Sequence, residues 1–224
     1  SRVHLLPMVM MPFILYWKHR QRRDLYLGSG LVLVSMAWFV YALLWTTDLR
    51  VVRSHGTLDV LRYYLTHPWE ATQAIRRTLQ DADMRDFYFR SFVGNLGWLD
   101  APLRSFFYPW LGIGLGLCAL ASISSPKHVG DLHARVVLLA IAFASSILVF
   151  IALLVTWTPH PAHVIVGVQG RYFVVPILLT RYAMSGVVPD KGTWRQSLDW
   201  LVLVAFSALS LTALFLGLQD RFAG

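Results

Sequence analysis

Residues 136–157 run from Val136 to Trp157 without one charged side chain. About 20 consecutive apolar residues allow an α-helix to cross a hydrocarbon core about 30 Å thick. Inside lipid the backbone must satisfy its own hydrogen bonds, which leaves helices and closed barrels as spanning structures. The segment lacks the alternation of apolar and polar residues that is typical of a barrel strand. It therefore predicts a membrane-spanning helix.

Other parts of the chain repeat this pattern. We predict an all-α, polytopic transmembrane helical protein, because three further stretches are equally free of charge and two shorter ones are apolar but contain prolines. The four complete spans are 25–46, 106–125, 136–157 and 200–218, and the two shorter candidates are 3–17 and 172–188.

Composition supports a membrane protein and argues against a nucleic-acid partner. Hydrophobic residues make up 56% of the chain and charged residues only 14%, which is unusual for a soluble domain. The net charge of +8 would otherwise suggest nucleic acid. Basic residues instead cluster between apolar runs, as in residues 18–24, and this pattern predicts loops on the cytoplasmic side. The lipid bilayer is therefore the expected partner.

Residues 47–105 form the one long polar segment. Acidic and basic residues nearly balance there, and alternation of the spans places it outside the cytoplasm. Pro68 suits a first helical turn, Trp69, Thr72, Ile75 and Leu79 share one helical face, and residues 57–66 are partly helical in pattern. We predict a single membrane domain over residues 1–224, with 47–105 as an extracytoplasmic loop of short amphipathic helices at the membrane surface.

Two glycine- and aromatic-rich segments lie on the predicted outer face, at 92–103 and 157–176. Gly170 allows the backbone to turn tightly or to approach another group closely. The planar, permanently charged fork of Arg171 suits a phosphate or a carboxylate, and an arginine beside aromatic rings suits a lipid headgroup. In the alternative interpretation Arg171 pairs with an acidic residue such as Asp100 and anchors a helix end.

These segments resemble a known family of bacterial membrane proteins. Phe92 to Leu103 match the pattern F-V-G-x-L-G-W-L-D-x-P-L, and Trp157 to Pro159 match W-T-P. The stretch from Gly167 matches G-V-Q-G-R-Y-F-x-P, with one residue more before Pro176. In these motifs and in the order of spans from about residue 25 onward, the chain resembles the C-terminal half of the family of predicted membrane proteins called domain of unknown function 2142.

The resemblance implies a function. The family is similar to membrane glycosyltransferases of the GT-C type, which transfer sugars from polyprenyl-phosphate carriers outside the bacterial inner membrane during polysaccharide assembly. It implies a longer protein, and the start at Ser1 agrees with a missing N-terminal part. In the implied reaction a carboxylate deprotonates an acceptor hydroxyl, and arginine or a metal ion stabilises the leaving polyprenyl phosphate.

Site residues follow from the matched motifs and the predicted outer face. Asp100 is the candidate catalytic base, ahead of Asp81, Asp83 and Asp86, which are also interpreted as solvated loop residues. A divalent cation remains open as a cofactor; His160 and His163 lack a third metal ligand nearby and are interpreted as turn residues. The candidate contacts to the lipid phosphate are Arg171, Gln169, Tyr172, Arg90 and Arg104.

Two other functions compete with an enzyme. The protein could be a non-enzymatic subunit that holds or moves lipid-linked sugars, since phosphate binding alone requires no base. A transporter is the third hypothesis, because Arg181 lies within an apolar segment interrupted by Pro176. Whether the chain is catalytic is therefore left open by the sequence.

Overall fold

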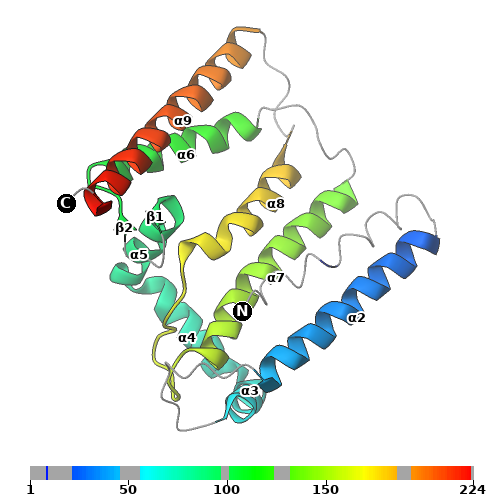
Figure 1. The fold of residues 1–224 in the computed structure, drawn as a ribbon. Coiled ribbons are helices and arrows are strands. Elements are labelled where there is room, and N and C mark those ends of the chain that lie inside the picture. Colours follow the sequence, from blue (N-terminus) through cyan, green and yellow to red (C-terminus); the bar gives the residue numbers. More distant parts are fainter. Residues whose placement is uncertain are drawn as a thin grey trace. The chain divides into compact units, whose positions relative to one another are not determined.

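The computed structural model describes residues 9, 22–45, 56–96, 101–123, 132–185 and 193–222, which are almost entirely helical (Figure 1). The all-α fold is confirmed. The chain divides into two compact units, one comprising Ser1–Arg85 and Ala140–Val168, the other Asp86–Leu139 and Gln169–Gly224. That residues 1–224 act as one membrane domain stays a prediction.

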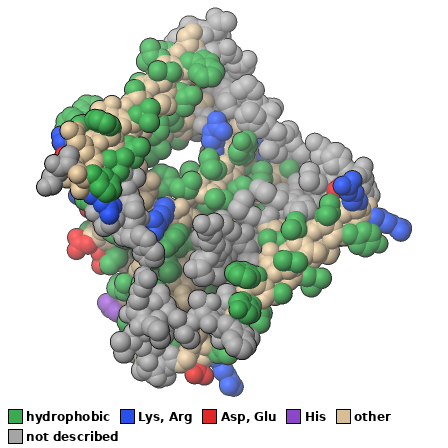
Figure 2. Space-filling view, in the orientation of Figure 1, with side chains coloured by type: hydrophobic (Ala, Val, Ile, Leu, Met, Phe, Trp, Pro, Cys, Tyr) green, Lys and Arg blue, Asp and Glu red, His purple; other side chains and the backbone are tan. Residues whose placement is uncertain are grey.

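The first described helix of the first unit is α2 (Arg22–Trp45), which contains residues 25–45 of the predicted span 25–46. The helix starts at Arg22, within residues 18–24, which were predicted to form a loop. Its first turn therefore contains charged residues. Large apolar side chains such as Leu33 and Trp38 are each 70% exposed on it. Figure 2 shows hydrophobic side chains along α2 and, in the other unit, along α9 (Thr193–Phe222). Such surfaces suit lipid better than water.

The polar segment folds into α3 (Thr57–Thr66) and α4 (Pro68–Gln80), as the sequence predicts. Pro68 occupies the first turn of α4, where its missing N–H costs no hydrogen bond. The buried side of α4 differs from the predicted apolar face. Ala74 and Thr78 are buried there, whereas Trp69 is 67% and Leu79 is 48% exposed.

The second unit contains two elements that the sequence did not predict. A further helix follows α4, and a short antiparallel hairpin pairs Asn95 with Pro102 and Leu96 with Ala101. The α5 helix is aromatic on several sides and so lacks a clear apolar stripe. Its elements are α5 (Ala82–Val93), which begins in the first unit, β1 (Asn95–Leu96), β2 (Ala101–Pro102), α6 (Phe107–Ile123), the start of α7 (Leu132–Thr156), η2 (Gly170–Phe173), α8 (Val174–Met184) and α9 (Thr193–Phe222).

The α6 and α9 helices pack side by side in this unit (Figure 1). Their shared core contains Leu103, Phe107, Leu111 and Ala213, and the buried Tyr108 hydroxyl accepts a hydrogen bond from the Leu103 N–H at 3.1 Å. The hairpin and the start of α6 are therefore fixed to one another by side-chain burial and by this hydrogen bond.

The number of membrane spans is only partly supported. Within the described residues, α7 and the Ser197–Phe222 part of α9 are long and apolar enough to cross a membrane, and Phe107–Ala121 is a shorter apolar helix. The prediction that 172–188 is a span is not supported, since α8 has 11 residues and reaches about 16 Å. The segment 3–17 lies outside the described residues except Val9. Four to six spans therefore stay a prediction.

Candidate functional site

The site is built around Gly170, which lies directly against the backbone of α5. The Gly170 N–H donates to Ser91 Oγ at 2.7 Å, and Ser91 Oγ donates in turn to the Tyr88 carbonyl at 3.2 Å. A Cβ atom on Gly170 would lie 2.6 Å from the Phe92 nitrogen and closer still to the Tyr88 carbonyl oxygen. Real Cβ atoms do not approach backbone this closely, so only glycine fits here. This contact brings the two sequence motifs together.

Arg171 and its neighbours continue from this anchored residue. The Tyr172 N–H donates to the Gln169 carbonyl at 3.0 Å and closes the turn of η2. Arg171 is exposed, and α8 begins three residues later, so its guanidinium precedes the positive end of a helix. Gln169 Oε1 is buried and accepts no hydrogen bond from the described residues. Permanent charge and helix dipole on one turn suit an anion.

Arg90 and Arg104, which were also predicted to bind phosphate, are engaged with carboxylates. Arg90 Nε donates to Asp86 Oδ2 at 2.6 Å, and its guanidinium lies 5.1 Å from the centroid of the Tyr108 ring. Arg104 binds both carboxylate oxygens of Asp220, at 2.7 and 2.6 Å. A phosphate at either arginine would have to displace a carboxylate.

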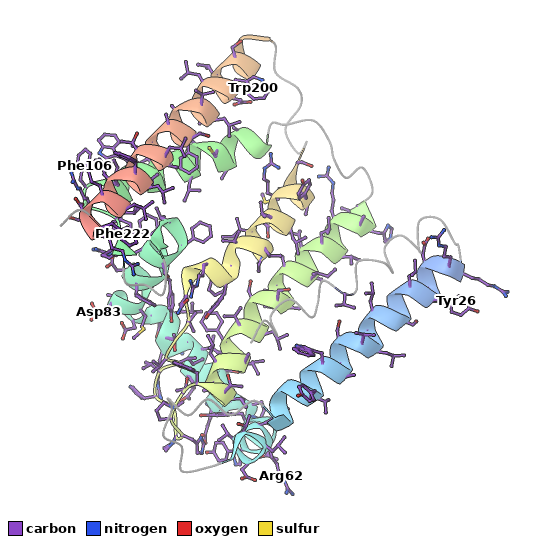
Figure 3. All side chains as sticks on the ribbon, viewed as in Figure 1. Tyr26, Arg62, Asp83, Phe106, Trp200 and Phe222 are labelled. Carbon is purple, nitrogen blue, oxygen red and sulfur yellow. The ribbon has the colours of Figure 1, made fainter. Side chains whose placement is uncertain are left out.

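The candidate carboxylates fall into different surroundings. Asp100 lies outside the described residues, and so does its proposed pairing with Arg171. Asp81 Oδ1 accepts the Met84 N–H at 3.0 Å and caps the start of α5. Asp83 is exposed in the first turn of α5, where Figure 3 labels it. Asp86 is held by Arg90, so that two of these four acids already have a structural role.

The histidine pair belongs to the first unit and does not form a metal centre there. The His160 ring packs edge-on against Tyr63, with ring centroids 4.6 Å apart. His163 Nδ1 lies 3.1 Å from Arg77 Nη1. Among the described residues no three His, Cys, Asp or Glu side chains gather, so these residues do not fit a divalent cation.

The second motif begins in the first unit at Trp157. Gly167 has a φ of +82°, and a Cβ there would lie 2.8 Å from Trp157 Nε1. Thr158 Oγ1 donates to the Leu153 carbonyl at 3.0 Å and accepts the Val166 N–H at 3.2 Å. The W-T-P and G-V-Q-G matches thus describe the two ends of one folded loop.

Comparison with known protein families finds one matching family model. The family model described as "Predicted membrane protein (DUF2142)" matches residues 1–180. The chain belongs to this family. The DUF2142 match includes both motif segments and starts at residue 1, earlier than the motif resemblance, while it ends within α8. Residues 181–224, which contain α9, lie outside it. No curated protein and no solved structure matches the chain.

Sequence reasoning missed the residues that hold this DUF2142 motif in place. Ser91 and Tyr88 precede the first motif in α5, and Asp220 lies near the end of α9, far from Arg104 in the chain. A serine one residue before the F-V-G pattern was the only local signal for the Gly170 contact. Nothing in the sequence pairs Arg104 with Asp220.

Proposed function

We propose that this DUF2142 protein is an integral membrane component of cell-envelope polysaccharide assembly, and that it binds the phosphate of a polyprenyl-phosphate-linked sugar at Gln169, Arg171 and Tyr172. The observation that carries the proposal is the contact of Gly170 with α5. Because Gly170 packs directly against α5, the turn that carries Arg171 is held at the start of α8, and the Gln169 amide oxygen of the same turn is buried without a hydrogen-bond partner among the described residues.

Charge-assisted hydrogen bonds explain how such a turn would hold phosphate. Arginine presents its donors in a planar fork that matches two phosphate oxygens. The Gln169 amide can turn its N–H₂ group toward a third oxygen, since the two ends of an amide are assigned only through their hydrogen bonds. The apolar helices of the same unit would accompany the polyprenyl chain into lipid.

Membership of a family of predicted membrane proteins supports the location. Arg135 Nη2 donates to the Ser185 carbonyl at 2.8 Å, so the start of α7 lies beside the end of α8. Lys127 and Arg135 at the first end, and Lys191 and Arg195 after the second, predict that both face the cytoplasm, and the bond agrees with their lying on one side. The Gln169–Tyr172 turn then belongs to the opposite, extracytoplasmic side, where lipid-linked sugars are used.

The catalytic version of the proposal is a GT-C-like sugar transfer. Asp100 would take the proton of an acceptor hydroxyl, whose oxygen would attack the anomeric carbon. The bond from that carbon to the phosphate oxygen would break, and Arg171 would stabilise the polyprenyl phosphate that leaves with the electron pair.

A second candidate function is a subunit that holds lipid-linked sugars without transferring them. The capping role of Asp81 and the ion pair of Asp86 favour it, because they leave fewer carboxylates for base catalysis. Binding at Arg171 is common to both candidates, whereas Asp100 matters only to the enzyme.

The binding step is tested with polyprenyl phosphate and the purified protein by native mass spectrometry. Arg171→Ala should weaken binding at least about tenfold, because a hydrogen bond to a charged group contributes roughly 1.5–3 kcal/mol. Arg85→Ala, which removes an exposed arginine from α5, is the matched control and should bind normally. Equal affinity in the Arg171→Ala variant would refute the proposed site.

Substitution of Asp100 distinguishes the two candidate functions. In cells whose own copy of the gene is deleted, Asp100→Asn should abolish the surface glycan if the protein is the transferase. Asp59→Asn, a change at an exposed acid of α3, should restore the glycan fully. Normal glycan with Asp100→Asn would favour the holding subunit. An unchanged glycan in the deletion strain itself would exclude both.

A further inference from the structure

The α3 and α4 helices of the first unit expose large apolar residues in addition to the residues that they bury. On α3, Val60 and Tyr64 are buried, while Leu58 is 54% and Leu65 is 72% exposed. Leu58, Arg62 and Leu65 follow an i, i+4, i+7 spacing and so form one stripe. Figure 3 labels Arg62 on the outward side of α3. Val60 and Tyr64 already form the buried apolar side of α3, so Leu58 and Leu65 are a second apolar stripe, which a water-soluble helix would not expose.

The α4 helix shows the same arrangement. Trp69 and Leu79 are exposed, and Arg76 lies between them at helical spacing from Trp69. Ala74 and Thr78 are almost completely buried on another side. Each helix therefore presents large apolar side chains with an arginine among them, and neither Arg62 nor Arg76 has an ion-pair partner among the residues that the structure describes.

Hydrogen bonds hold α3 and α4 close to the end of α7 within the first unit. The loop after α7 is held to the helix end by Thr158, which bonds to the Leu153 carbonyl. The same loop is held to the short helices, since the Ile165 N–H donates to Thr78 Oγ1 at 2.8 Å and the Ala162 N–H donates to Tyr64 Oη at 3.3 Å. A candidate membrane span ends at Thr156, so α3 and α4 are bound to the point where it leaves the hydrocarbon.

From these contacts we infer that the stripe of Leu58, Arg62, Leu65, Trp69, Arg76 and Leu79 lies in the boundary between lipid headgroups and acyl chains. Leucine and tryptophan side chains enter the acyl side of this boundary, where indole rings are favoured. Arg62 and Arg76 extend along their apolar stems to the lipid phosphates. The occupant of the exposed face is the bilayer surface at the end of α7. The inference is independent of sugar-lipid binding at Arg171.

Spin labelling of the purified protein in liposomes tests this placement. The only cysteine, Cys118, is replaced by serine, and a nitroxide is attached at Leu65→Cys. Oxygen concentrates in lipid, whereas a nickel chelate stays in water, so the ratio of their collision rates reports the surroundings of the label. The matched control is Asp59→Cys, an exposed position on the same helix outside the stripe.

The expected oxygen-to-nickel ratio is several-fold higher at position 65 than at position 59. Equal ratios at both positions would place the stripe in water and overturn the inference. Exclusion of both probes from position 65 would show that a protein segment covers the face, which overturns it as well. Labels at two exposed positions leave the buried side of α3 intact, and the elution volume of each variant verifies its fold.

Discussion

At Gly170 there is room for a hydrogen atom and for no larger group. A methyl group at this position would meet the Phe92 nitrogen at 2.6 Å, and backbone cannot move aside as a side-chain tip can. Gly170→Ala should therefore lower stability by about 1–3 kcal/mol or more, and should weaken phosphate binding by shifting Arg171. Thermal unfolding in detergent, followed by intrinsic fluorescence, measures the first effect.

The matched control is Gly116→Ala in α6, because a Cβ there meets no atom within 4 Å. This variant should match or slightly exceed the stability of the natural chain, since alanine favours helix over glycine. If both substitutions left the melting temperature unchanged, the close contact between η2 and α5 would be wrong.

Thr78 is the second residue on which a contact depends. Its buried hydroxyl donates to the Ala74 carbonyl at 2.7 Å and accepts the Ile165 N–H at 2.8 Å. Thr78→Val keeps the shape but leaves that N–H without a partner, which should cost about 1–3 kcal/mol. Thr72→Val, at an exposed hydroxyl bonded only to the Pro68 carbonyl, should cost much less. Chemical denaturation measures the free energy of unfolding of both variants. Equal decreases in Thr78→Val and Thr72→Val would contradict the role of Thr78.

At the scale of elements, α3 and α4 are joined by a hydrogen bond that depends on pH. Tyr63 Oη donates to Glu70 Oε2 at 2.6 Å, and this bond raises the pKa of Tyr63 above its ordinary value. Burial raises the pKa of the neighbouring Tyr64 as well. A group whose folded pKa is raised stabilises the fold below its unfolded pKa and ceases to do so as pH rises through the folded pKa.

The melting temperature should therefore decline once the pH rises above about 10, the unfolded pKa of tyrosine. Tyr63→Phe should flatten part of this decline, because the phenol that loses its proton is absent. Glu70→Gln should do the same, since the carboxylate that opposes ionisation is neutralised. If the melting temperature fell equally steeply with pH in the natural chain and in both variants, the bond between Tyr63 and Glu70 would not link the helices.

Some elements could be predicted from local chemistry. Pro68 marks the start of α4, and the long uncharged runs indicate α7 and α9, because length and hydropathy suffice for these. The hairpin at Asn95–Pro102 could not be predicted, since two residues per strand give no alternation. Ser91 could be identified as a site residue only from its hydrogen bond with Gly170 in the structure.

At the scale of the whole molecule, the family and the apolar helices agree on a membrane protein. Orientation remains the property on which the proposed function depends, because sugars carried on polyprenyl phosphate are used outside the cytoplasm. The basic loops are the reason for which we propose that loop 157–173 lies on the outer side. The side of this loop is open to direct measurement.

Cysteine labelling in spheroplasts tests that orientation most directly. In a Cys118→Ser background, Val166→Cys places a thiol at a 43% exposed position of the loop, and Leu132→Cys places one at the 70% exposed start of α7. A membrane-impermeant maleimide should label position 166 in intact spheroplasts and position 132 only after lysis. Labelling of position 166 only after lysis would place the Gln169–Tyr172 turn in the cytoplasm and contradict the account.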